Sequence, residues 1–134
     1  MASIFTEIIE GKRLGFIIFE DENHIAILDK YPIDTGHSLV IPKKPYEKIT
    51  DMPKNEVADL FSHVPQIATA ILKATGAVAF SIAQNNGKEA KQIIPHVHVH
   101  IIPRYADKAT MWTKRGIPSD DELQELQKKI TRSF

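Results

Sequence analysis

The sequence PHVHVH, at residues 95–100, alternates three histidines with two valines. Such alternation is typical of a strand with one buried face, because successive side chains point to opposite faces. His96, His98 and His100 therefore share one face, and the valines turn toward a core. Neighbouring histidines on that face are about 6.6 Å apart, from a rise of about 3.3 Å per residue. The three imidazoles can thus converge on one small ligand.

Three interpretations of this histidine face are open. An ordinary solvent-facing strand surface fits poorly, because no Lys, Thr or Glu is mixed with the three histidines. A metal site is possible, since His-x-His is a common ligand spacing, and the nearest acids are Glu89 and Asp107. A phosphate site is favoured, because imidazoles donate hydrogen bonds to phosphoryl oxygens and can attack phosphorus. The polar loop NNGKEAKQ at 85–92 can add backbone N–H groups that bind an anion.

The remaining patterns predict one α+β domain over residues 1–134. Apolar runs bounded by turn residues predict five strands, which are mostly antiparallel because their connections are short. Apolar residues at helical spacing predict three helices, the second one long, kinked at Pro65 and packed on the sheet. Ser119 and Glu122 form a capping box at the start of the C-terminal helix. The strands are expected at 15–21, 24–29, 37–42, 77–85 and 96–103, and the helices at 3–10, 53–75 and 119–130.

Composition excludes several classes of function. Lys plus Arg equals Asp plus Glu at 17 each, which argues against a nucleic-acid binder with a broad positive surface. The chain has no cysteine, so disulfides and thiolate metal ligands are excluded. No apolar run approaches the roughly 20 residues of a membrane span, and the first residues do not resemble a signal peptide. We expect a cytoplasmic protein that binds neither nucleic acid nor membrane.

Beyond these patterns, HVHVHII at 96–102 resembles the His-φ-His-φ-His-φ-φ signature of the histidine triad superfamily of nucleotide hydrolases and transferases. The similarity extends over about residues 3–105 in the usual order. It includes IFTEIIEGK at 4–12, LDKYPIDTGHSLVIPKK at 28–44, the loop at 85–92 and HIIPRY at 100–105. The resemblance implies a five-stranded antiparallel sheet with a long helix packed on it. It also implies a homodimer whose two sheets join.

The resemblance assigns roles to four histidines. His98 takes the place of the nucleophile that attacks the α-phosphorus of a nucleotide. His96 matches the first triad histidine, which supports and orients that nucleophile. His100 and His37 match histidines that contact the phosphate. No cofactor is implied.

Six further residues are expected to bind the nucleotide by the same resemblance. Asp29 matches the acid that holds the ribose hydroxyls, and Asn85 matches a polar residue on the phosphate and ribose side. The others are Gln92 in the polar loop and the apolar residues Phe5, Ile8 and Ile27, which would sandwich the base.

The chain departs from its relatives at several positions. Some relatives begin C-I-F-C and carry a structural zinc, whereas this chain has Ser3 and Thr6 there, and Pro45 replaces a further zinc histidine. We therefore expect no structural zinc and no bound metal. Ile93 replaces a hydroxyl residue and removes one phosphate hydrogen bond. Lys91 replaces a loop glycine and adds a positive charge where a longer polyphosphate would lie.

The sequence therefore leads to an enzyme hypothesis. The protein would release a nucleoside 5′-monophosphate, adenosine monophosphate by family usage, through a covalent nucleotidyl-His98 intermediate that water hydrolyses. An amine leaving group would make it a phosphoramidase, and a nucleotide leaving group a dinucleoside polyphosphate hydrolase. One alternative is an interaction protein that binds adenosine monophosphate and has incidental catalysis. Another is a metal-binding module.

Overall fold

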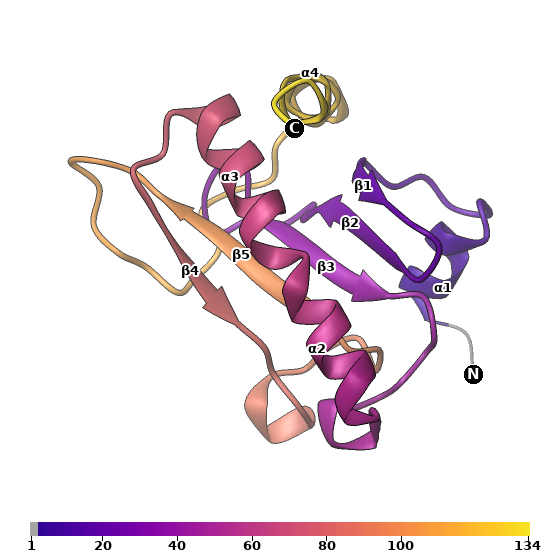
Figure 1. The fold of residues 1–134 in the computed structure, drawn as a ribbon. Helices are drawn as coiled ribbons and strands as arrows, with labels where there is room; N and C mark the ends of the chain where they lie inside the picture. Colours follow the sequence, from indigo (N-terminus) through magenta and orange to yellow (C-terminus); the bar gives the residue numbers. More distant parts are fainter. Residues whose placement is uncertain (1–2) are drawn as a thin grey trace.

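The computed structural model describes residues 3–134 and contains a five-stranded antiparallel sheet (Figure 1). Every neighbouring pair of strands is antiparallel, which confirms the predicted α+β architecture. In space the strands follow the order β1-β2-β3-β5-β4, so the histidine-bearing strand β5 lies inside the sheet. The strands are β1 Ile17–Glu20, β2 His24–Leu28, β3 Ser38–Pro42, β4 Ala79–Ala83 and β5 Val99–Arg104.

Four α-helices surround this sheet, and α2 and α3 run end to end across one face of it (Figure 1). None of the helices in residues 3–134 has the length and apolar character needed to cross a bilayer. Two short 3-10 turns, Ile49–Asp51 and Lys88–Ala90, lie in the loops. The α-helices are α1 Ile4–Ile9, α2 Lys54–Ser62, α3 Val64–Thr75 and α4 Asp120–Thr131.

The long helix predicted over 53–75 is interrupted at His63, where α2 ends and α3 begins. Pro65 is in the first turn of α3 and has no N–H group to donate to the carbonyl of Phe61. The ladder of hydrogen bonds therefore breaks here, and the next one runs from the Ile67 N–H to the His63 carbonyl. At the predicted kink, the structure has a one-residue interruption at His63 between two helices that run end to end.

Strands β1, β2 and β3 place alternate residues in two separate apolar clusters, one on each face of the sheet. The helix-side cluster packs under α2, α3 and α4 and includes Ala26, Leu28, Val40, Val97, Val99 and Ile101. The α1-side cluster consists of Phe5, Ile8, Ile25, Ile27, Leu39 and Ile41. Because Val99 and Ile101 face the helix side, His98 and His100 face the α1 side. The predicted division of histidines and valines between two faces is confirmed.

Strand β5 begins at Val99, three residues later than predicted. The ladder between β3 and β5 ends at the Val40–Val99 pair, while β3 continues to Pro42 in its ladder with β2. Beyond it, the Val97 N–H donates to the carbonyl of Tyr46, outside the sheet. Residues 96–98 keep the alternation of a strand without its ladder, so the His96 carbonyl is free for another partner.

Helix α4 closes the helix-side core near β1. Its Leu123 and Ile130 are buried in the helix-side cluster, and the Gln127 side-chain amide donates to the Ile17 carbonyl (2.8 Å). The predicted capping box is confirmed: the Ser119 hydroxyl accepts from the Glu122 N–H (3.1 Å), and the Glu122 carboxylate accepts from the Ser119 N–H (3.4 Å).

Ser119→Ala should lower the free energy of unfolding by about 1 kcal/mol, because the first turn of α4 loses a capping acceptor. Ser119→Asp should retain most of the stability, since its carboxylate can accept the same hydrogen bond. Urea unfolding at constant m-value measures both variants. Equal losses for Ala and Asp would show that the cap contributes nothing.

Candidate active site

Four histidines converge beside the α1-side cluster. The ring centroids of His98 and His100 are 4.9 Å apart, and those of His37 and His100 are 5.1 Å apart. His37 reaches them because it immediately precedes β3, the strand that pairs with β5. His37 and His96 are buried, and His98 is 8% exposed. The structure thus gathers the four histidines that the sequence analysis selected.

Backbone and side-chain hydrogen bonds occupy both ring nitrogens of His96. Nε2 lies 2.8 Å from the Pro42 carbonyl, which can only accept, so Nε2 carries the proton. Nδ1 then accepts from the hydroxyl of Ser3 (3.1 Å). Ser3 can donate there because its oxygen already accepts the Thr6 N–H as the N-cap of α1. His96 therefore has no free nitrogen for chemistry, and the sequence analysis missed the contribution of Ser3.

The ring of His98 has one nitrogen in a hydrogen bond and one without a hydrogen-bond partner among residues 3–134. Nδ1 lies 2.7 Å from the carbonyl of His96 and must donate to it. In the neutral ring Nε2 is then an unprotonated lone pair. No hydrogen-bond partner for Nε2 is found within residues 3–134. An imidazole in this state is a competent nucleophile without a separate base.

His37 and His100 form a hydrogen-bonded pair next to His98. The Ile33 N–H donates to His37 Nδ1 (2.9 Å), so Nε2 of neutral His37 carries the proton. This Nε2 lies 2.9 Å from His100 Nδ1 and 3.5 Å from the Asp29 carboxylate. When His37 donates to His100 Nδ1, neutral His100 must carry its own proton on Nε2. His100 can therefore donate a hydrogen bond to a ligand.

Burial keeps the cluster neutral. Desolvation lowers the pKa of His96, His98 and His37 below the usual value for histidine. The pKa of His100 falls to about 4, through burial first and then through the neighbouring His98 and His37. Neutral imidazoles at physiological pH agree with the tautomers deduced above.

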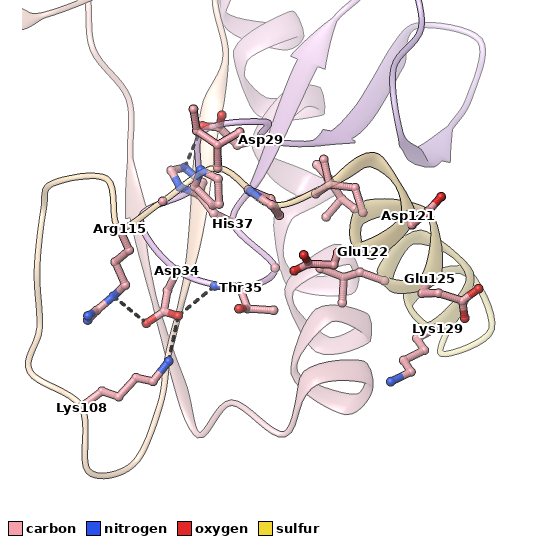
Figure 2. A pocket seen from close by; sticks show the side chains of 18 residues that line it. Asp29, Asp34, Thr35, His37, Lys108, Arg115, Asp121, Glu122, Glu125 and Lys129 are labelled. Carbon is pink, nitrogen blue, oxygen red and sulfur yellow. Dashed lines mark hydrogen bonds and ion pairs between the residues drawn. The ribbon is translucent and has the colours of Figure 1, made fainter.

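Asp29 lies on the edge of a large cavity (Figure 2). One of its carboxylate oxygens accepts from the Tyr31 N–H (2.9 Å), and the other faces His37. The cavity, of about 750 Å3, extends from Asp29 and His37 to α4. Asp34 lies in its wall and is paired with Lys108 and Arg115, each at 3.2 Å (Figure 2). The three triad histidines do not line this cavity, so it lies beside them, reaching the site through His37.

The three apolar residues expected to hold the base lie together in the α1-side cluster. Phe5, Ile8 and Ile27 are all buried. The Phe5 ring packs edge-on against His98 (centroids 5.0 Å apart) and His96 (5.8 Å). In this conformation these side chains support the histidines from behind, and their role in base binding stays a prediction.

The polar loop 85–92 comes shortly before His96 in the chain, and hydrogen bonds from side chains fix its conformation. Gln92 accepts from the Gly87 N–H (2.7 Å) and donates to the Glu47 carbonyl (2.6 Å), so its amide organises the loop. Asn86, which the sequence analysis did not select, accepts from the Ile49 N–H (2.8 Å). Asn85 is half-buried and has no side-chain hydrogen bond within residues 3–134. Lys91 has a φ of 64°, the left-handed conformation that favours glycine.

With this geometry in view, comparison with known proteins identifies the class. Residues 11–107 match the model of the HIT domain family. The match covers most of the chain, and the chain therefore belongs to the histidine triad (HIT) family.

Individual relatives are similar along nearly the whole chain. This chain is 40% identical to adenylylsulfatase HINT3 of Arabidopsis thaliana, and the alignment covers 96% of this chain and 68% of the relative. It is 34% identical to adenosine 5'-monophosphoramidase HNT1 of Saccharomyces cerevisiae, covering 96% and 80%. Among solved structures, a hypothetical histidine triad nucleotide-binding protein of Sulfolobus tokodaii superposes with a TM-score of 0.89 at 35% identity, covering 96% and 89%.

The neutral histidine cluster should make the protein acid-sensitive. In the unfolded chain these rings titrate near pH 6.5, whereas in the folded protein their pKa values are lower. The unfolded state therefore binds more protons below pH 6.5, and the free energy of unfolding falls as the pH drops toward 4.

His100→Gln should flatten this dependence, because one depressed pKa is removed. Urea unfolding of the wild type and of His100→Gln at pH 7.5, 6.0 and 5.0 measures this dependence. For each protein, the free energy of unfolding is compared with its own value at pH 7.5. Parallel losses of stability in the two proteins would contradict the assignment.

Proposed function

We propose that this protein is a hydrolase that releases a nucleoside 5′-monophosphate through a nucleotidyl-His98 intermediate. One observation carries the proposal. Among the four histidines of the site, His98 alone combines an unprotonated ring nitrogen with no partner in residues 3–134, and its pKa is lowered by burial. Such a nitrogen is ready to attack phosphorus at neutral pH.

In the first step, His98 Nε2 forms a bond to the α-phosphorus and the bond from phosphorus to the leaving group breaks. The ring becomes positively charged, and the His96 carbonyl that accepts the Nδ1–H (2.7 Å) stabilises that charge. The Nε2–H of His100 donates to the developing negative charge beside it. In the second step, water attacks the same phosphorus and releases a proton to solvent, and the bond between phosphorus and His98 Nε2 breaks. The nucleoside monophosphate then leaves, and His98 returns to its neutral form.

The names of the relatives support adenosine 5′-phosphate as the transferred group. An adenylylsulfatase and an adenosine 5'-monophosphoramidase share that group and differ in the leaving group. We infer the same specificity for this chain. A panel with an adenosine phosphoramidate, adenylyl sulfate and a diadenosine polyphosphate, each assayed for release of adenosine monophosphate, identifies the leaving group.

The substitution of Ile93 for a hydroxyl residue favours a second candidate, an interaction protein that binds adenosine monophosphate. The Ile93 side chain is exposed and cannot donate to a phosphate. This candidate predicts tight binding of adenosine monophosphate with slow turnover of all three substrates. The same panel therefore separates the two functions.

His98→Asn should reduce kcat by about a thousandfold or more, because the attacking nitrogen is lost. Binding of adenosine monophosphate should persist, since the phosphate contacts remain. Quenching the wild type during turnover should trap an acid-labile nucleotidyl adduct, which tandem mass spectrometry should locate on residue 98.

His96→Asn and His100→Asn serve as matched controls and should leave measurable turnover. The assignment fails if the adduct maps to either of these residues. It also fails if His98→Asn turns over at a rate comparable to the wild type.

Asp29→Ala should raise KM by about tenfold or more while kcat changes less. A carboxylate that accepts ribose hydrogen bonds acts equally in the ground and transition states, and a charged hydrogen bond contributes about 1.5–3 kcal/mol. Asp29→Asn is the control, because it can still accept from the Tyr31 N–H that shapes the turn. A collapse of kcat with an unchanged KM would place Asp29 in the chemical step instead.

We further propose that two copies pair through β4. This strand is one edge of the sheet. Val78, immediately before it, is 68% exposed, and Phe80 and Ile82 within it are 39% and 47% exposed. The opposite edge, β1, is partly covered by Gln127 of α4. Open edges with apolar side chains are sites of association.

Light scattering at micromolar concentration should give the mass of a dimer for the wild type. Ile82→Lys should give a monomer, because a charge would enter the apolar interface. A monomeric wild type, or a dimeric Ile82→Lys protein, would contradict pairing through β4.

A further inference from the structure

A second cluster of histidines and acids lies away from the triad. Asp21 is in the turn between β1 and β2, His24 begins β2, Asp59 is in α2, and His63 is the junction between α2 and α3. His24 shares its strand face with Ala26 and Leu28, which pack in the helix-side cluster. The cluster is therefore on the opposite side of the sheet from His98 and His100, and the proposed reaction does not use it.

His24 is held so that one ring nitrogen remains free. Its Nδ1 lies 3.0 Å from Asp21 Oδ1, an acceptor that is itself fixed by the N–H groups of Asn23 (2.9 Å) and His24 (2.7 Å). The proton therefore resides on Nδ1, and Nε2 presents a lone pair. That Nε2 faces Asp59 Oδ2 at 3.7 Å, beyond hydrogen-bond distance. The side chain is buried, so the orientation is fixed by packing.

His63 has a second ring nitrogen without a hydrogen bond, and this nitrogen also faces Asp59. Its Nε2 is buried and has no hydrogen-bond partner among residues 3–134. It lies 3.1 Å from Asp21 Oδ2, without the alignment of a hydrogen bond, and 3.7 Å from Asp59 Oδ1. The rings of His24 and His63 are close, with centroids 4.5 Å apart. A buried polar atom without a partner requires an explanation.

The two carboxylates of the cluster lack a permanent cation. No lysine or arginine within residues 3–134 forms an ion pair with Asp21 or Asp59. The nearby Lys43 is paired with Glu20 at 2.7 Å. Two negative charges therefore face two imidazole nitrogens, which is the charge pattern of a cation site.

We infer that this cluster binds a divalent transition-metal ion of the Zn2+ type. His24 Nε2, His63 Nε2, Asp59 and Asp21 Oδ2 supply the ligand atoms. Metal bonds of about 2.0–2.2 Å in a tetrahedral site place neighbouring ligand atoms about 3.3 Å apart. Three separations lie near that value: His63 Nε2 is 3.1 Å from Asp21 Oδ2, and Asp59 is 3.7 Å from His24 Nε2 through Oδ2 and 3.7 Å from His63 Nε2 through Oδ1.

The contact between Asp21 and His24 supports this assignment. Metal-binding histidines usually donate their other N–H to a carboxylate or carbonyl, which fixes the tautomer and orients the ring. Asp21 Oδ1 has this role for His24 Nδ1. The missing cysteines predict a protein without metal, but this site uses only histidine and carboxylate ligands. An ion here joins the β1–β2 turn to the α2–α3 junction and should stabilise the fold.

The experiment must separate this cluster from the triad region. Asp29, His37 and His100 also offer ligand atoms that lie close together. Full-length protein freed of metal by dialysis against chelator is titrated with Zn2+ by calorimetry and with Co2+ by visible absorption at pH 7.5. The wild type and His37→Gln should each bind one ion at the cluster, with the intense absorption of tetrahedral Co2+. His63→Gln should weaken this binding by about a hundredfold or more.

Thermal unfolding gives a second readout. Zn2+ should raise the Tm of the wild type and of His37→Gln but not of His63→Gln or Asp59→Asn. Two variants of the cluster are used so that the test still stands if one of them fails to fold. Binding that is lost in His37→Gln and retained in His63→Gln would place the ion at the triad and overturn the inference. Absence of binding at tens of micromolar Zn2+ would also overturn it.

Discussion

The hydrogen bond from His98 Nδ1 to the carbonyl of His96 is the interaction on which the site depends. A carbonyl has no proton to give, so this contact alone decides which nitrogen of His98 is protonated. The opposite nitrogen is left as a lone pair. Because the contact is made within a three-residue segment of the backbone, the orientation of the proposed nucleophile does not rely on a distant side chain. In the proposed reaction, the same carbonyl would stabilise the positive charge that forms on the His98 ring.

The fold makes this contact possible because the pairing of β3 with β5 ends at Val40 and Val99, before the chain reaches residues 96–98. In a regular strand the His96 carbonyl would face an N–H of the neighbouring strand. Here β3 stops at Pro42, and the Pro42 carbonyl accepts from the His96 ring. The backbone of residues 96–98 is thereby released from the ladder while Val97 keeps the segment anchored in the helix-side core. Burial then lowers the pKa of the histidines, so that the neutral tautomers persist at physiological pH.

Patterns of local chemistry were predictable from the sequence. The alternation at 96–101 places the histidines and valines on opposite faces, and Ser119 with Glu122 defines the start of α4, because both depend on neighbours in the chain. The late start of β5 depends on where its pairing with β3 ends, which periodicity does not show. The bond between Ser3 and His96 joins residues 93 positions apart. A contact between residues so far apart in the chain is not shown by any local pattern of the sequence.

The most direct test of this account is the protonation state of the histidine rings, measured by long-range 15N–1H correlation NMR at pH 7.5. The account predicts that neutral His98 carries its proton on Nδ1. It also predicts that His96, His37 and His100 carry theirs on Nε2. A His98 ring protonated on Nε2, or charged at this pH, would contradict the account.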